Sequence, residues 1–169
     1  MAARISLRDY QRELAARLQG AAGRRVASKL GLQVGAEAWL VDLTEAAEVV
    51  PVPPITPVPL ARPWFRGVAN IRGNLYGVVD FSAFLGGPPA AASEQARLLL
   101  LGERFRMGCA LLVDRSLGLR NLEQLRPLAP EASRVPWVRA EYGDKEGMRW
   151  KVLNVAQLVQ QPEFLAAGA

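Results

Sequence analysis

Residues 64–81 read WFRGVANIRGNLYGVVDF, and this stretch decides the predicted fold. Residues 67–71 and 75–81 have the length and the apolar content of two β-strands. Gly73 and Asn74 lie between them, and both residue types accept a positive φ. We therefore expect an antiparallel hairpin with Gly73-Asn74 as its two-residue turn.

Short strands and frequent turns continue on both sides of this hairpin. Prolines crowd residues 51–63, and each one fixes φ and removes a backbone donor, so this connection can be neither a central strand nor a helix. Pro54 and Pro57 also match a P-x-x-P ligand motif, but globular sequence continues on both sides of them. Short strands of this kind favour small barrels. The other strand candidates are residues 30–34, 39–43, 48–52, 97–101, 107–114, 117–121, 137–142 and 148–153.

Helical periodicity is confined to the two ends of the chain and to one short turn. Residues 6–22 carry an apolar stripe at helical spacing, with Ser6 as N-cap, and this stripe could pack on the protein body or on a partner. Residues 82–85 predict a helical turn. Residues 155–165 predict a short C-terminal helix that Pro162 interrupts.

A glycine- and proline-rich segment, residues 86–95, is the clearest linker in the sequence. It predicts a division of the chain into two comparable halves. The expected organisation is an N-terminal helical extension, residues 1–28, followed by one domain, residues 29–169. Within that domain, lobe one spans about residues 29–86 and lobe two about residues 96–155.

The composition is that of a globular domain, with 169 residues, 50% of them hydrophobic and 22% charged. The net charge is +5, but the arginines are dispersed and form no basic run, which favours an ordinary solvated surface over a nucleic-acid interface. No signal peptide is visible, and no apolar stretch is long enough to span a bilayer. We expect a cytoplasmic protein without direct membrane insertion.

The residue inventory excludes several kinds of chemistry. The chain has no histidine and one cysteine, Cys109, so it lacks the ligands of a structural zinc site and the base of a Ser–His or Cys–His arrangement. The carboxylate pairs Glu45 with Glu48 and Asp42 with Asp80 could serve a hard cation or acid–base chemistry, but their neighbours are typical of strand ends and turns. We expect no enzyme, no metal and no cofactor.

Four residues of the opening stretch carry special geometry or charge. Gly67 precedes a strand and Gly73 lies in the turn, where backbone freedom is needed. Asp80 ends the second strand, where its carboxylate could accept hydrogen bonds from turn N–H groups. Arg72 presents a fork of donors suited to a carboxylate, either on a partner or within the chain.

The same stretch resembles a phrase that is typical of the CheW family of chemotaxis coupling proteins. Gly67, Asn70, Arg72, Gly73 and Asp80 match that phrase residue by residue. The resemblance extends from about residue 29 to residue 159. It departs from the family pattern at Gly77, where a proline is usual, and at Ala110, where the family has a glycine.

This resemblance implies a mostly β fold of two SH3-like five-stranded β-barrels that share a hydrophobic core. It implies a non-enzymatic adaptor that couples the cytoplasmic tip of a methyl-accepting chemoreceptor to the regulatory domain of a CheA-type histidine kinase. Details of the sequence favour the type IV pilus (twitching motility) chemosensory branch. The alternative is a basic nucleic-acid-binding module built on SH3-like barrels.

The resemblance also assigns roles to residues. It makes Arg72 the polar anchor of a receptor-binding surface, and it places Glu48 where an acidic residue can pair with that arginine. Asn70, Val41 and Val49 would lie near the same groove. Whether Arg72 points at a partner or at Glu48 stays open at the level of the sequence.

Overall fold

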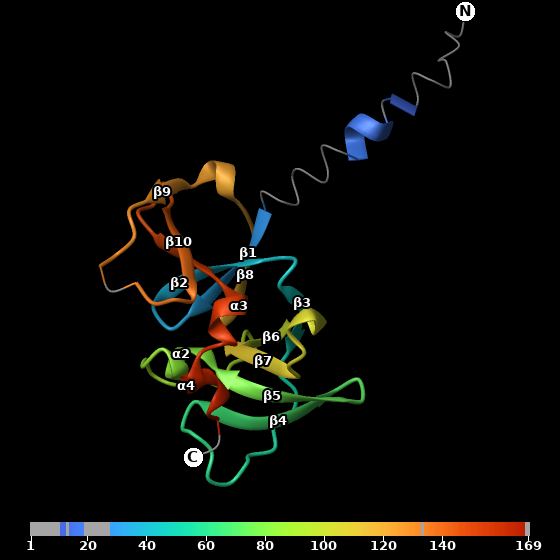
Figure 1. Ribbon diagram of the computed structural model, residues 1–169, viewed down its shortest axis with the longest axis vertical. Coiled ribbons are helices and arrows are strands. Elements are labelled where there is room, and N and C mark those ends of the chain that lie inside the picture. The colour runs from blue at the N-terminus through green and yellow to red at the C-terminus, as the bar shows by residue number, and fades with distance from the viewer. Residues whose placement is uncertain (1–10, 13, 19–27, 133, 168–169) are drawn as a thin grey trace, which may run out of the picture.

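Two β-sheets form the body of the protein in the computed structural model, which describes residues 11–12, 14–18, 28–132 and 134–167 (Figure 1). The six-stranded sheet has the order β8 (Arg115–Asn121), β1 (Ser28–Val34), β2 (Glu37–Asp42), β11 (Arg149–Leu153), β10 (Val138–Gly143) and β9 (Arg126–Leu128). The five-stranded sheet has the order β3 (Ala46–Pro51), β6 (Arg97–Leu101), β7 (Cys109–Val113), β5 (Asn74–Asp80) and β4 (Phe65–Ile71). The expected mostly β fold with two sheets is confirmed.

The strand pairing does not follow the predicted division of the chain into halves. Strands β1 and β2 leave the first half and pair with strands of the second half, while β6 and β7 make the reverse exchange. Two parallel pairs, β2 with β11 and β5 with β7, join the halves. The local pattern predicts where strands lie but not which partner each one takes, so the linker at residues 86–95 does not mark a boundary between the sheets.

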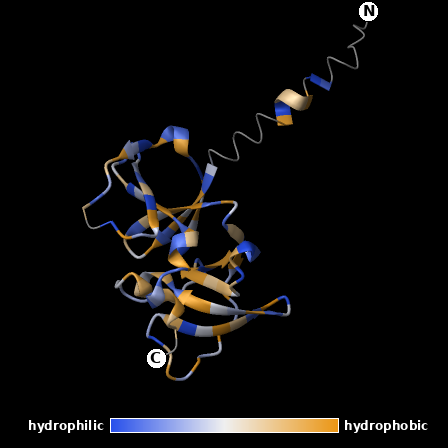
Figure 2. Cartoon of the chain, viewed as in Figure 1, coloured by the Kyte–Doolittle hydropathy of each residue, from blue (hydrophilic) through white to orange (hydrophobic). Residues whose placement is uncertain are grey.

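A hydrophobic core lies between the two sheets and is shared by them. Strand β7 is buried along its whole length, with Leu111 and Val113 in the shared core and Leu112 in the interior of the five-stranded sheet. This arrangement follows from the alternation of side chains along a strand. In Figure 2 much of the five-stranded sheet is orange, and its strands β6 and β7 are buried on both of their faces.

The five-stranded sheet closes on itself through the proline-rich connection. Thr56 in that connection exchanges two backbone hydrogen bonds with Val68 of β4, at 2.8 and 2.9 Å. Gly67 lies at this contact with a φ of +128°, and a Cβ on it would come 2.0 Å from the Thr56 carbonyl oxygen. The closure therefore requires a glycine at position 67.

The six-stranded sheet keeps two free edges among the described residues, β8 and β9. The sequence did not predict β9, a three-residue strand that contains Pro127 and so belongs at an edge. The interior of the sheet is filled by Ala38, Leu40, Trp150 and Val152. This sheet thus has one strand more than the five predicted for a barrel. No backbone pairing joins its two edge strands among the described residues, and side chains fill the space between them.

The remaining elements are short helices. The helical turn at residues 82–85 is observed as α2 (Phe81–Phe84), and the C-terminal helix is split into α3 (Val155–Leu158) and α4 (Pro162–Leu165), with Pro162 in the first turn. Two 3-10 turns are also present, η1 (Glu103–Phe105) and η2 (Leu122–Gln124).

The N-terminal helix is described in part. Residues 11–12 and 14–18 are helical, and the exposed side chains of that part include Leu14 and Leu18. The rest of the predicted helix at residues 6–22 lies outside the described residues. Among the helices that the structure describes, none is both long and apolar enough to cross a bilayer.

Candidate functional site

The turn of the β4–β5 hairpin is formed by Arg72 and Gly73, not by Gly73 and Asn74 as predicted. Ile71 pairs with Asn74, which leaves Arg72 and Gly73 as the two loop residues. Their φ angles are +54° and +85°. A type I′ turn requires a positive φ at both of these positions. Asn70 holds the turn, because its Oδ1 accepts a hydrogen bond from the Gly73 backbone N–H at 2.9 Å.

The side chain of Arg72 points at Glu48, which answers the question that the sequence left open. The contact is bidentate: Arg72 Nη1 donates to Glu48 Oε2 at 2.7 Å, and Nη2 donates to Oε1. Glu48 belongs to β3, and Arg72 follows β4, and these are the two outer strands of the five-stranded sheet. The ion pair thus spans the seam at which that sheet closes, at the tip of the hairpin.

This ion pair is exposed to solvent, so a partner can reach it. The side chain of Arg72 is 71% exposed and that of Glu48 is 37% exposed. The hydrogen bonds from Arg72 lower the pKa of Glu48, and the same bonds raise the pKa of Arg72. Both groups therefore stay charged over the whole physiological range. A charged fork with open donors can bind a second carboxylate or a carbonyl.

The two valines that were expected near this groove belong to the core instead. Val41 is fully buried in the core shared by the two sheets, so it cannot touch a partner. Val49 is half-buried and packs against the same core. Because successive side chains of a strand point to opposite faces, Val49 does not lie beside Glu48. Of the predicted contact residues, only Arg72, Glu48 and Asn70 come together at the hairpin tip.

Asp80 has the turn-stabilising position that the sequence predicts. It is completely buried, and its Oδ1 accepts the N–H of Ala83, capping α2. Its Oδ2 accepts the N–H of Ala90 at 2.9 Å, and Arg66 Nε lies 3.6 Å from it. Asp80 therefore fixes the chain between β5 and the linker, and its oxygens are already occupied.

A buried carboxylate, Glu45, lies where the two sheets meet. The sequence placed this residue only in a pair with Glu48, but it is 1% exposed in the connection between β2 and β3. Its Oε1 accepts from Arg104 at 3.3 Å and from Arg139 at 3.1 Å. These partners lie 59 and 94 residues away along the chain, so no local pattern could have shown the cluster.

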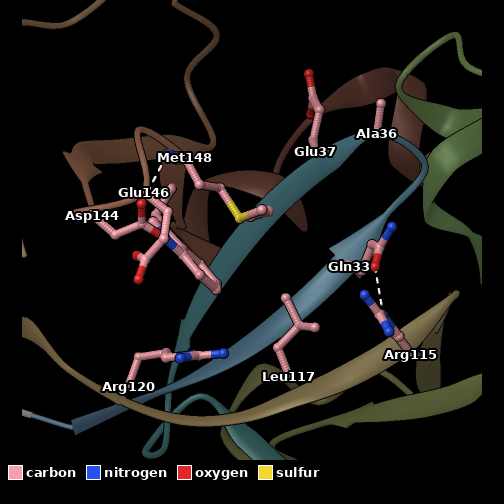
Figure 3. A pocket seen from close by; sticks show the side chains of 11 residues that line it. Gln33, Ala36, Glu37, Arg115, Leu117, Arg120, Asp144, Glu146 and Met148 are labelled. Carbon is pink, nitrogen blue, oxygen red and sulfur yellow. Dashed lines mark hydrogen bonds between the residues drawn. The ribbon is translucent and has the colours of Figure 1, made fainter.

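A hollow opens at the free edge of the six-stranded sheet, with a volume of about 440 Å³ (Figure 3). In Figure 3, Leu117 and Arg120 on β8 lie across the hollow from Glu146 and Met148, which belong to the β10–β11 connection. Two of its walls are held by hydrogen bonds, from Arg115 Nε to Gln33 Oε1 at 2.6 Å and from the Met148 N–H to Asp144 at 2.8 Å.

Trp150 forms the apolar base of this hollow and is positioned by polar neighbours. Its Nε1 donates to Asp144 Oδ2 at 3.0 Å, and this bond lowers the pKa of Asp144. The guanidinium of Arg120 lies 5.2 Å from the centre of the Trp150 ring. Met148, which lines the hollow, is 49% exposed. The hollow therefore offers apolar contact area next to charge.

The described residues offer little for metal or thiol chemistry. Among them, no group of three or more His, Cys, Asp or Glu side chains lies close enough together to hold a metal ion. Cys109 is buried in the shared core, and burial raises the pKa of its thiol to about 12. A thiol with such a pKa is not a nucleophile at neutral pH.

Comparisons with known proteins agree with the two-sheet fold. Residues 29–163 match the family model described as CheW-like domain. The chain is 30% identical over 144 residues to Protein PilI of Pseudomonas aeruginosa, covering 82% of this chain and 78% of that protein. It is 32% identical over 85 residues to Chemotaxis protein CheW of Rhizobium meliloti, covering 50% of this chain and 54% of that protein. The crystal structure of the scaffolding protein TtCheW from Thermoanaerobacter tengcongensis superposes with a TM-score of 0.67 at 17% identity, covering 82% of this chain and 90% of that chain.

Proposed function

Because the chain belongs to the CheW-like domain family, we propose that it is a non-enzymatic adaptor that couples chemoreceptors to a CheA-type histidine kinase. Its partners would be the cytoplasmic tip of a methyl-accepting receptor and the regulatory domain of the kinase. The similarity to PilI supports a role in pilus-linked rather than flagellar signalling. No observation on the described residues favours the alternative of a nucleic-acid-binding module.

The observation that carries the receptor-binding half of this proposal is the exposed ion pair of Arg72 and Glu48. The pair holds a planar guanidinium in one orientation at the tip of a rigid hairpin. Such a preorganised fork loses little conformational entropy when it binds a partner. Receptor binding would thus use Arg72 as the anchor, with Asn70 and Glu48 fixing its place.

The kinase-binding half would use exposed apolar positions away from Arg72. Leu117 and Met148 line the hollow of the six-stranded sheet, and the barrel-like kinase domain would dock its own sheet edge there. An interface of moderate size suits reversible assembly. A Met148→Asp exchange should then weaken kinase binding and leave receptor binding unchanged, because it buries a charge in that contact only.

A pull-down with a purified receptor tip tests the role of Arg72. The Arg72→Glu protein should lose most of its receptor binding, whereas Arg126→Glu, with the same charge change on β9, should bind as the wild type does. Undiminished binding by Arg72→Glu would show that Arg72 is not the anchor.

The exchanged double variant Arg72→Glu with Glu48→Arg separates two roles of the pair. It rebuilds the ion pair but puts the guanidinium on β3 instead of the hairpin tip. Continued loss of receptor binding in this variant is the result expected if Arg72 contacts the receptor. Restored binding would mean that the pair only stabilises the hairpin.

A further inference from the structure

Two exposed arginines have a left-handed backbone conformation in turns of the five-stranded sheet. In the described part of the chain, three residues other than glycine have a positive φ: Leu60 at +56°, Arg72 at +54° and Arg106 at +51°. Residues with a Cβ seldom adopt this conformation, and such outliers gather at sites of function. Arg72 lies at the hairpin tip, and Arg106 ends η1 in the connection between β6 and β7. Both arginine side chains are exposed to solvent.

A cleft of about 320 Å³ lies between the hairpin and the β6–β7 connection, which are on the same side of the sheet in Figure 1. Residues 74–76 at the start of β5 form one wall, and residues 106–108 form the other. The Gly77 N–H donates to the Gly108 carbonyl oxygen at 2.7 Å, which fixes the two walls relative to each other. Position 108 requires a glycine, because a Cβ there would come 2.9 Å from the Leu75 carbonyl oxygen. The cleft is therefore preformed.

The cleft exposes apolar surface at the end of a sheet. Leu75 is 68% exposed although it belongs to a strand. Met107 is half-buried on the opposite wall, and the buried Leu101 also lines the cleft. Apolar surface that is concave and has polar residues at its rim is typical of an interaction site. The cleft can therefore accept an apolar side chain of a partner.

Arg106 supplies a guanidinium that has no partner among the described residues. Its backbone N–H donates to the Glu103 carbonyl oxygen at 2.9 Å, which fixes the turn. Its side chain makes no hydrogen bond or ion pair within the described ranges, and neither does the carboxylate of Glu103, which lines the same cleft. Arg72, by contrast, directs two N–H groups to Glu48. Arg106 therefore offers its whole fork of donors to a carboxylate from outside the chain.

The cleft is continuous with the ion pair at the hairpin tip. Asn74, which lines the cleft, follows the two turn residues directly. Tyr76 also lines the cleft, and its phenol adds a smaller electrostatic contribution to that of Glu48 in raising the pKa of Arg72. A partner segment that contacts Arg72 can thus extend into the cleft.

We propose that the receptor segment bound at the hairpin tip also inserts an apolar side chain between Leu75 and Met107 and places a carboxylate against Arg106. This inference rests on the proposed receptor binding and adds the chemistry of the partner, which is a segment with an apolar and an acidic residue close together. The Arg72–Glu48 pair has no net charge, so it does not select an acidic partner by itself. Arg106 makes that selection.

The affinity of the full chain for the purified receptor tip, measured by isothermal titration calorimetry, tests the charge. Arg106→Gln should weaken binding about tenfold, because a charge-assisted hydrogen bond to the carboxylate is lost. Arg106→Lys keeps the charge but not the fork, so its loss should be smaller, about threefold. Glu103→Gln should bind more tightly than the wild type, because it removes the carboxylate that repels the partner's own. Arg126→Gln on β9 is the matched control and should bind as the wild type does.

Two further variants separate binding from a structural role. Arg106→Gly suits a positive φ, so it should unfold at a Tm no lower than that of the wild type and still bind as weakly as Arg106→Gln. A lower Tm together with unchanged affinity would assign Arg106 to the fold instead. Leu75→Asp should weaken binding, whereas Leu60→Asp should not, because Leu60 is an exposed leucine in the proline-rich connection, away from the cleft.

The outcomes distinguish this inference from the proposed function. If the wild type binds the receptor tip and Arg106→Gln binds equally well, the inference is wrong and receptor binding stands. If Glu103→Gln weakens binding as Arg106→Gln does, the partner does not bring a carboxylate to the cleft, and the inference is also wrong. If the wild type does not bind the receptor tip, both the proposed receptor binding and the inference are wrong.

Discussion

The two sheets differ in how their edges are closed and how their interiors are filled. The five-stranded sheet closes its seam with backbone hydrogen bonds between Thr56 and Val68, and Arg72 bonds to Glu48 across the same seam. The six-stranded sheet leaves β8 and β9 as edges among the described residues and fills its interior with Trp150. The closed sheet presents a rigid hairpin tip, whereas the open sheet presents a hollow. One fold thereby presents an exposed ion pair on one sheet and a partly apolar hollow on the other.

Removing the side chain that fills the open sheet should have the largest effect. Trp150 is 2% exposed. Trp150→Ala leaves a large cavity, for which we expect a loss of about 4 kcal/mol in the free energy of unfolding. In a domain of this size that corresponds to a fall of about 12 °C in Tm. Thermal unfolding followed by circular dichroism measures it.

Trp150→Phe is the matched control, because it keeps an aromatic ring and loses the bond to Asp144. It should lie between the wild type and Trp150→Ala in Tm. Equal stability of Trp150→Ala and the wild type would mean that Trp150 does not support the open sheet.

Gly67→Ala should break the closure of the five-stranded sheet. The new Cβ would meet the Thr56 carbonyl at 2.0 Å, and alanine disfavours a φ of +128°. Overpacking and backbone strain together predict a loss of about 3 kcal/mol. Gly73→Ala separates the two causes, because Gly73 has a positive φ but open space around it. It should lose only about 1 kcal/mol. Urea unfolding of both variants measures the difference, and equal losses would contradict the closure.

The contact that joins the two sheets should have an intermediate effect. In Glu45→Gln the two arginines lose the charge that they share. Hydrogen bonds to a charged group contribute more than neutral ones, so we expect a loss of about 2 kcal/mol. The loss is smaller than for a fully buried pair because both guanidiniums are about half exposed. Chemical denaturation measures it. Glu48→Gln is the control. A larger loss of stability in Glu48→Gln than in Glu45→Gln would contradict the conclusion that the buried Glu45 contributes more to the fold than the exposed Glu48.

The local hydrophobic pattern predicted most of the strands but did not predict how distant strands pair. The alternation in residues 30–34 corresponds to β1, and the apolar run in residues 97–101 corresponds to β6. Both were predictable because burial of one face of a strand produces alternation and burial of both faces produces an apolar run. The exchange of strands between the halves depends on parallel pairs such as β2 with β11, for which the sequence carries no local signal.

The candidate site was also predicted only in part. The glycines and Asn70 indicate a turn, and the resemblance to a known phrase pointed to Arg72 and Glu48. Which valines face solvent could not be predicted, because a half-buried strand such as β3 offers similar residues to both faces. The turn was placed one residue too late because Asn and Gly share a tolerance for positive φ, and Arg72 occupies a position that an arginine seldom takes.

The smallest expected effect concerns the protonation of Glu48. The hydrogen bonds from Arg72 lower the pKa of Glu48 in the folded protein below its ordinary value of 4.5. A lowered folded-state pKa means that the ion pair contributes stability above pH 4.5 and that this contribution is lost as the pH falls through the lowered pKa. In Arg72→Ala the pKa of Glu48 should therefore return toward 4.5. Titration of the Glu48 carboxyl carbon by NMR measures it. Because the pair is exposed, Tm at neutral pH should scarcely change, and a Glu48 pKa that is equal in both proteins would show that the seam of the closed sheet is not bridged in solution.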